Sequence, residues 1–165
     1  MKGLGHAILT GEPLIGDQPF GVVLSDDLCL NRGGSGVLAQ MAALYEEFQC
    51  SIVAVQEVPM DEVDKYGVVA GTAERGGLTR VTEMVEKPPQ DEAPSNLAVI
   101  GRYIVTPNIF RNLSRTHIGS VNEVQLTDAA SDEIAVSDNV YSFRFDGQHF
   151  DCGTKNGFLQ ATVAF

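Results

Sequence analysis

The sequence predicts an α/β fold, in which helices cover a central sheet of parallel and antiparallel strands. The first indication is a pair of continuous apolar runs, residues 20–24 and 51–55, with an amphipathic segment between them. Such runs are typical of buried parallel strands, and the order strand, helix, strand predicts a right-handed crossover. The second indication is a pair of segments, residues 66–70 and 78–87, that flank a glycine-containing turn and predict an antiparallel hairpin.

The remaining elements follow from local patterns. Two glycines precede a short helix that we expect to end near Gly11. A second helix is amphipathic, because its apolar side chains recur on one stripe at Val37, Met41, Leu44, Tyr45 and Phe48. Further helices are expected over residues 106–113, from residues 123–128 onward and over 154–165, with a strand at 140–145. The glycine-rich residues 32–36 lack the lysine of a phosphate-binding loop and are interpreted as a connector.

Composition narrows the class of protein. With 165 residues the chain suits a single domain with a buried core, and its formal net charge of −11 disfavours binding to nucleic acid. We expect no membrane association and a cytoplasmic location, since no run approaches the roughly 20 apolar residues of a membrane span and no signal peptide is evident. Three cysteines without close spacing argue against a disulfide framework or a structural zinc site.

Acidic residues follow two of the predicted strands. Asp26 and Asp27 end the run at 20–24, and Asp151 ends a segment near the C-terminus. Ligands of open α/β sheets bind at the carboxyl ends of strands, and magnesium prefers oxygen ligands, so Asp26 and Asp151 are candidates for a Mg²⁺ site. Each aspartate alone is more often a turn residue or a helix cap. Asp27 is equally expected to be a capping residue or an acid that supports the metal ligands from behind.

The segment Glu86-Lys87-Pro88-Pro89 is the second candidate site. Glu86 can accept hydrogen bonds from sugar hydroxyls, Lys87 can donate to a phosphate oxygen, and the two prolines restrict the backbone that follows. A phosphorylated sugar is therefore a plausible ligand. Taken in isolation, the same residues would be a surface ion pair before a turn.

Seven segments carry a resemblance to a known family, and they occur in the family's order. They are residues 2–7, the strand ending at Asp26 and Asp27, and residues 66–69, 85–88, 93–103, 123–128 and 151–155. Together they resemble the bacterial UTP-glucose-1-phosphate uridylyltransferases over nearly the whole chain. The resemblance implies a Rossmann-like nucleotidyltransferase fold with a nucleotide and metal part at about residues 1–58 and a sugar-binding part at about 59–165. It also implies transfer of a uridylyl group from UTP to glucose 1-phosphate, giving UDP-glucose and pyrophosphate.

The same resemblance implies roles for individual residues. Asp26 and Asp151 are similar to the magnesium ligands, and Lys87 and Asp26 are the expected catalytic residues. The expected substrate-binding residues are Gly3 at the uracil, Glu86 at the glucose hydroxyls, Lys87 at the sugar phosphate, and Gly67 and Asn96 in the sugar pocket. His6 is expected to be a packed or capping residue rather than a base.

The chain also departs from the family pattern. The family's loop Gly-x-Gly-Thr-Arg-x-x-Pro-x-Thr-Lys and the first strand-helix units of its sheet have no counterpart here, so we interpret the chain as an internal piece of the enzyme that is inactive alone. The complete protein is expected to be a homo-oligomer. Two alternatives stay open: a related nucleotidyltransferase that uses dTTP, and a noncatalytic module that binds a sugar nucleotide.

Overall fold

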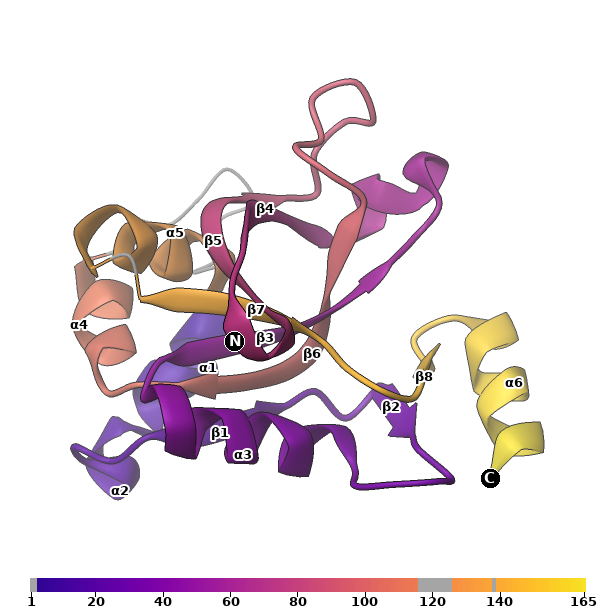
Figure 1. The fold of residues 1–165 in the computed structure, drawn as a ribbon, viewed down its shortest axis with the longest axis horizontal. Coiled ribbons are helices and arrows are strands. Elements are labelled where there is room, and N and C mark those ends of the chain that lie inside the picture. Colours follow the sequence, from indigo (N-terminus) through magenta and orange to yellow (C-terminus); the bar gives the residue numbers. More distant parts are fainter. Residues whose placement is uncertain (1–2, 116–125, 138) are drawn as a thin grey trace.

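The computed structural model describes residues 3–115, 126–137 and 139–165, and every structural statement below refers to these ranges. One sheet has six strands in the order β1-β6-β3-β7-β5-β4, and β4 pairs with β6 as well as with β5 (Figure 1). Five strands therefore form a closed circuit, with β1 added outside it. The strands are β1 Phe20–Val23, β3 Ser51–Glu57, β4 Gly67–Ala73, β5 Leu78–Glu86, β6 Leu97–Val105 and β7 Val140–Arg144.

The sheet is mixed, which confirms the predicted α/β class, but its strand directions correct one expectation. Strands β3 and β7 are parallel, whereas β1 is antiparallel to β6 and lies at the end of the strand order. The prediction of a buried parallel strand at residues 20–24 is therefore wrong, and Val23 is 52% exposed. Strands β1 and β3 still run in the same direction, because both are antiparallel to β6 between them. An apolar run of five residues cannot distinguish a central strand from one at a sheet edge.

Two layers of helices cover the large sheet. Helix α3, Val37–Phe48, packs against one face, with the predicted apolar stripe turned inward. Helices α1 Leu4–Thr10, α4 Asn108–Arg115 and α5 Leu126–Ser137 pack against the other face (Figure 1). Strand β3 contributes to both cores through alternating side chains, as the twofold period of a strand requires: Ile52 faces the α3 side and Val53 the opposite side.

The predicted hairpin is confirmed, since β4 and β5 pair in antiparallel register with Gly67 opposite Glu86. Short helical segments complete this part of the chain: α2 Glu12–Ile15, η1 Met60–Lys65 and η2 Arg75–Gly77. The expected helix start within residues 123–125 lies outside the described residues. None of the described helices combines the length and apolar character needed to span a bilayer.

A second, two-stranded sheet was not predicted. Strands β2, Asp27–Leu30, and β8, Gln148–Asp151, are antiparallel, and their register places Asp27 opposite Asp151. Helix α6, Lys155–Ala164, follows β8 and lies apart from the other helices (Figure 1). Thr154 is its N-cap, because its hydroxyl oxygen accepts a hydrogen bond from the Gly157 amide at 3.1 Å. We call β2, β8 and α6 the small unit.

Candidate functional site

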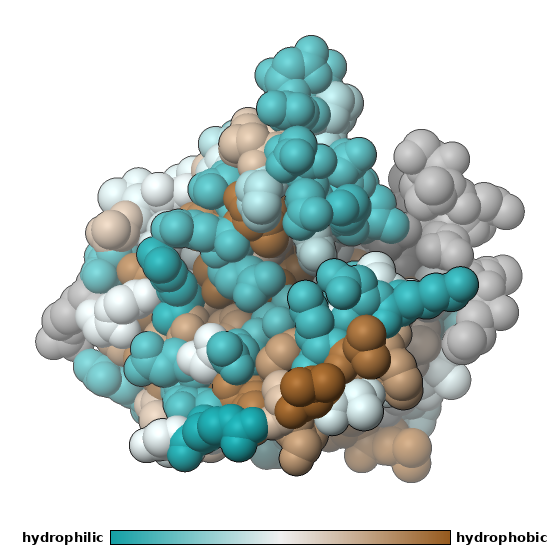
Figure 2. Space-filling view, turned by 90° about the vertical axis from the view of Figure 1, so that its right-hand side faces the viewer, coloured by the Kyte–Doolittle hydropathy of each residue, from teal (hydrophilic) through white to brown (hydrophobic). Residues whose placement is uncertain are grey.

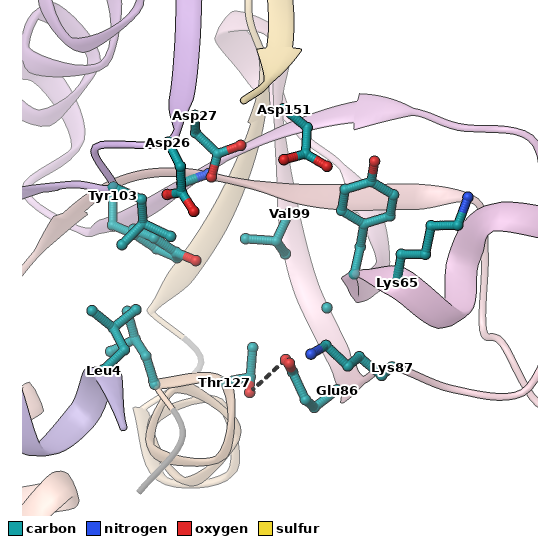
Figure 3. A pocket seen from close by; sticks show the side chains of 15 residues that line it. Leu4, Asp26, Asp27, Lys65, Glu86, Lys87, Val99, Tyr103, Thr127 and Asp151 are labelled. Carbon is teal, nitrogen blue, oxygen red and sulfur yellow. Dashed lines mark hydrogen bonds between the residues drawn. The ribbon is translucent and has the colours of Figure 1, made fainter. Parts of the chain in front are cut away.

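A cavity of about 340 Å³ lies between the small unit and the large sheet. Asp26, Asp27 and Asp151 line one side, and Glu86 and Lys87 line the opposite side (Figure 3). The loop between β1 and β2 carries Asp26, the end of β8 carries Asp151, and the end of β5 carries Glu86. Segments far apart in sequence therefore bring both predicted groups of residues to one cavity.

The cavity is acidic. Among the described residues that line it, four carboxylates, those of Asp26, Asp27, Glu86 and Asp151, face the ammonium groups of Lys65 and Lys87. Lys65 is also paired with Glu62 at 3.0 Å on the surface. A phosphate group entering this cavity would meet net negative charge, so its binding would be favoured by an accompanying cation.

Asp26 and Asp151 face the same point. A methyl group built on Gly153 would lie 3.0 Å from Asp151 Oδ1 and 3.7 Å from Asp26 Oδ2. The backbone fixes both residues, since the Cys152 amide donates to the Asp26 carbonyl at 2.7 Å and the Gly153 amide donates to Asp151 Oδ1 at 2.9 Å. In the described part of the chain, no group of three or more His, Cys, Asp and Glu residues is arranged around a metal position. A cation here would thus take its other ligands from water or substrate.

Arg102 holds the loop that carries the acids. Its guanidinium is buried and donates hydrogen bonds to three carbonyls, those of Leu24 at 3.1 Å, Gly101 at 2.7 Å and Asp27. Buried carbonyls without a partner are costly, so these bonds stabilise one conformation of the loop. Gly101 is required here, because a Cβ at this position would lie 2.6 Å from the Cβ of Leu24.

Asp27 is held by its side chain. Its Oδ2 accepts a hydrogen bond from the Gly101 amide at 3.2 Å, and its Oδ1 lies 2.5 Å from Nε2 of His149. The second ring nitrogen of His149 lies 3.1 Å from the side-chain nitrogen of Gln56. Both carboxylate oxygens of Asp27 are therefore engaged by the protein.

The opposite side of the cavity is shaped by backbone conformation. Lys87 has a φ of +47° although it precedes Pro88, and its amide donates to the Tyr66 carbonyl at 2.9 Å. A positive φ is rare for a residue with a side chain, and strained conformations are concentrated at functional sites. The Thr127 hydroxyl donates to Glu86 Oε2 at 3.1 Å and orients that carboxylate (Figure 3).

Two tyrosines beside the carboxylates have shifted acidities. Burial raises the pKa of Tyr103 strongly, and the charges of Glu86 and Asp27 raise it further. Burial also raises the pKa of Tyr66, with a smaller contribution from Asp151. Both phenols consequently stay protonated at neutral pH and can donate hydrogen bonds into the cavity.

Five of the predicted site residues line this cavity: Gly67, Glu86, Lys87, Asp26 and Asp151. Two predicted residues do not. Gly3, at a φ of +92°, directly precedes Leu4, which lines the cavity. The Asn96 side-chain amide donates to the Val58 carbonyl at 3.2 Å, and the Asn96 carbonyl accepts from the Val58 amide at 3.0 Å, so Asn96 ties the start of β6 to the end of β3. The assigned roles of all seven residues stay predictions.

Several residues that build the site were not predicted from the sequence, namely Lys65, Tyr66, Tyr103, Thr127, Arg102 and His149. Most lie inside or beside the segments that carry the family resemblance. Their positions along the chain do not reveal that they converge, because the contacts are made across the two sheets.

Comparisons with known proteins give the same result as the sequence motifs. A family model described as Nucleotidyl transferase matches residues 1–165. The UTP–glucose-1-phosphate uridylyltransferase of Pseudomonas aeruginosa is 57% identical over 162 residues, which cover 98% of this chain and 58% of the relative. The Bacillus subtilis protein of the same name is 40% identical over 164 residues, covering 99% of this chain and 55% of the relative.

Solved structures are similar over the same part. A UDP-glucose pyrophosphorylase complexed with UDP-glucose has a TM-score of 0.96 and 52% identity, covering 99% of this chain and 62% of that chain. A UTP-bound UGPase from Acinetobacter baumannii has a TM-score of 0.85 and 38% identity, covering 98% of this chain and 55% of that chain. The expected resemblance is confirmed, and this chain spans little more than half the length of these relatives.

Proposed function

Because the chain belongs to the nucleotidyl transferase family, we propose that it is part of an enzyme that transfers a uridylyl group from UTP to glucose 1-phosphate. The products would be UDP-glucose and pyrophosphate. One observation carries the proposal: Glu86 and Lys87 face Asp26 and Asp151 across a single cavity. The names of the relatives support the choice of nucleotide and sugar.

The sugar phosphate would bind on the Glu86 and Lys87 side. The Lys87 ammonium is suited to a phosphate oxygen, and the Glu86 carboxylate, oriented by Thr127, can accept hydrogen bonds from hydroxyl groups. Gly67 keeps this space open, since a Cβ there would lie 3.0 Å from the Thr127 methyl group and 3.2 Å from Glu86 Oε2. We retain Gly3 as the contact for uracil and Asn96 as a residue that shapes the sugar pocket.

We propose Asp26 and Asp151 as the ligands of Mg²⁺. Their oxygen donors suit this ion, which commonly binds through one or two carboxylates together with water and phosphate oxygens. When bound, the ion would neutralise charge on the phosphates, which the acidic cavity by itself does not do. Asp27, whose two oxygens are engaged by Gly101 and His149, is not assigned as a ligand.

The reaction requires alignment more than proton transfer. An oxygen of the sugar phosphate forms a bond to the α-phosphorus of UTP, and the bond from that phosphorus to pyrophosphate breaks. The attacking phosphate is already ionised at neutral pH, so no side-chain base is needed. Lys87 and Asp26 are the residues proposed to act in catalysis, by orienting the attacking phosphate and by holding the cation that offsets charge.

The proposal is tested by magnesium-dependent pyrophosphate release from UTP and glucose 1-phosphate, measured on the natural full-length protein. We expect Asp151→Asn and Lys87→Met each to lower turnover by about 100-fold or more, in the range typical for loss of an electrostatic catalytic group. Asp146→Asn is the matched control, because Asp146 is exposed and does not line the cavity. Unchanged turnover in both site variants would contradict the proposal.

We further propose that the 165 residues alone do not turn over. The described residues offer two ammonium groups to the cavity against four carboxylates, which is too little positive charge for a triphosphate. Formation of UDP-glucose by the purified 165-residue chain would overturn this. If the full-length protein binds UDP-glucose with magnesium but shows no turnover, a noncatalytic binding module is the better description.

Location and assembly complete the proposal. Cys29, Cys50 and Cys152 form no disulfide bonds, which supports the proposal of a cytoplasmic location.

Helix α6 exposes several large apolar side chains, and Figure 2 shows an apolar patch on the face that carries this helix. They are Phe158 and Leu159 at 62% exposure, Val163 at 82% and, just after the helix, Phe165 at 69%. Such a patch suits contact with further protein, either the rest of a longer chain or a second copy. We retain the homo-oligomer as a proposal for the complete protein, and sedimentation analysis of that protein tests it.

A further inference from the structure

We propose that His149 is a positioning residue that fixes Asp27 and thereby sets the place of the cation ligands Asp26 and Asp151. This inference rests on the proposed function, since it assumes that these two carboxylates bind a divalent cation. His149 does not line the cavity, and its side chain is only 3% exposed. It therefore acts through Asp27 rather than on substrate.

The contacts of His149 select one tautomer. The side-chain nitrogen of Gln56 can only donate, so Nδ1 of His149, 3.1 Å away, must accept. The ring proton then resides on Nε2, which donates to Asp27 Oδ1 at 2.5 Å. Gln56 thus orients the imidazole, and the imidazole orients the carboxylate, as in the supporting hydrogen bonds found behind many metal ligands.

This chain of hydrogen bonds connects the two sheets. Gln56 lies in β3 of the large sheet, whereas His149 and Asp27 lie in β8 and β2 of the small unit. The Gly101 amide, from β6 of the large sheet, donates to the other oxygen of Asp27. Asp27 is consequently held by donors from both sheets.

The position of the small unit decides where the proposed cation binds. Asp151 is the last residue of β8, and Asp26 directly precedes β2 and accepts a hydrogen bond from the Cys152 amide, so the positions of both ligands depend on this unit. The opposite side of the cavity, with Glu86 and Lys87, belongs to the large sheet. A shift of the small unit would change the separation of the two sides, and misplacement of reacting groups by about 1 Å can cost about 100-fold in rate.

The experiment measures binding of Mn²⁺, an electron paramagnetic resonance probe that accepts the same oxygen ligands as Mg²⁺, to the natural full-length protein. We expect His149→Leu to weaken binding about tenfold, as is typical for loss of a group supporting a metal site. His149→Gln should stay within about threefold of wild type, because glutamine keeps one donor and one acceptor. His6→Leu is the matched control and should bind as wild type does. Asp151→Asn reports loss of the cation site itself.

The possible outcomes separate the two proposals. If wild type binds no Mn²⁺, or Asp151→Asn binds as well as wild type, the metal assignment fails and the role of His149 fails with it. If Asp151→Asn loses binding while folded His149→Leu retains it, only the role of His149 is overturned. Equal losses in His149→Gln and His149→Leu would also overturn it, because hydrogen bonding would then be irrelevant.

A second variant covers the case in which His149→Leu does not fold. Gln56→Met keeps the side-chain length in β3 but removes the donor to Nδ1, and circular dichroism reports whether each variant is folded. We expect Mn²⁺ binding to weaken about threefold, a smaller effect than direct loss of the imidazole. Binding equal to wild type in folded Gln56→Met would overturn the positioning chain.

Discussion

The two sides of the cavity are held in place by different means. On the acidic side, hydrogen-bond donors from Arg102, His149 and backbone amides fix the loop and the carboxylates. On the opposite side, Lys87 is placed by a strained backbone at the end of a paired strand. The acidic side therefore depends on its donors and on the space that Gly101 leaves open, whereas the place of Lys87 depends mainly on the backbone conformation of that residue.

The largest effect is expected from crowding the acidic side. Gly101→Ala would place a methyl group 2.6 Å from the Leu24 Cβ, so the loop carrying Asp26 and Asp27 must shift. We expect the free energy of unfolding to fall by about 2–3 kcal/mol, the upper range for overpacking. Urea unfolding measures this. Gly33→Ala is the control, because nothing lies within 4 Å of a Cβ there, and it should change stability by less than about 0.5 kcal/mol. Equal unfolding midpoints for the two variants would contradict the prediction.

Tyr103 responds to both sides of the cavity, since burial raises its pKa and the charges of Glu86 on one side and Asp27 on the other raise it further. In the unfolded chain the phenol titrates near pH 10, so its contribution to stability is complete below that pH and is lost as the pH rises further. Between pH 8 and pH 11 the free energy of unfolding should fall by about 1.4 kcal/mol more in wild type than in Tyr103→Phe. Urea unfolding of both proteins at the two pH values measures this difference. Identical losses would show that the phenol is not protected from ionisation.

Lys87 separates conformation from charge on the opposite side. Lys87→Gly removes the steric strain of the positive φ of +47°, because glycine adopts this conformation freely. We expect this variant to be more stable than wild type by about 1 kcal/mol, even after the entropy cost of glycine. Lys87→Met keeps the strain and should leave stability unchanged. Both variants should bind glucose 1-phosphate about tenfold more weakly, since a hydrogen bond to a charged group is lost. Thermal unfolding and calorimetric titration of the full-length protein give the two readouts. A stabilised Lys87→Met would show that strain is not the cause.

The smallest effect is expected at Thr127. Thr127→Val keeps the shape of the side chain but removes the hydroxyl that donates to Glu86 Oε2. We expect a loss of about 0.5–1 kcal/mol in unfolding free energy, because Glu86 faces the cavity and can be hydrated instead. Thr162→Val, on the surface of α6, is the control for removal of an exposed hydroxyl. If Glu86 needs no orientation, affinity for glucose 1-phosphate will be the same in Thr127→Val and wild type.

Much of the fold could be predicted because its signals are local. The apolar stripe of α3, the turn between β4 and β5, and the start of α6 near Thr154 each depend on residues close in sequence, and each is confirmed. The position of β1 at the end of the sheet, antiparallel to β6, was not predicted, since this pairing joins residues about 80 positions apart. The small sheet was missed because β2 and β8 have four residues each and pair across most of the chain.

The sequence by itself determined which residues carry charge and which segments can form strands and helices, and it identified Asp26, Asp151, Glu86 and Lys87 as candidates. Local composition and the order of motifs contain that information. Only the tertiary structure decided that these four residues share one cavity, that Asn96 lies outside its lining, and that Arg102 and His149 hold the acidic side. The reason is physical: a buried guanidinium or imidazole is satisfied by partners that the folded sheets bring together, and the spacing of residues along the chain does not record those partners.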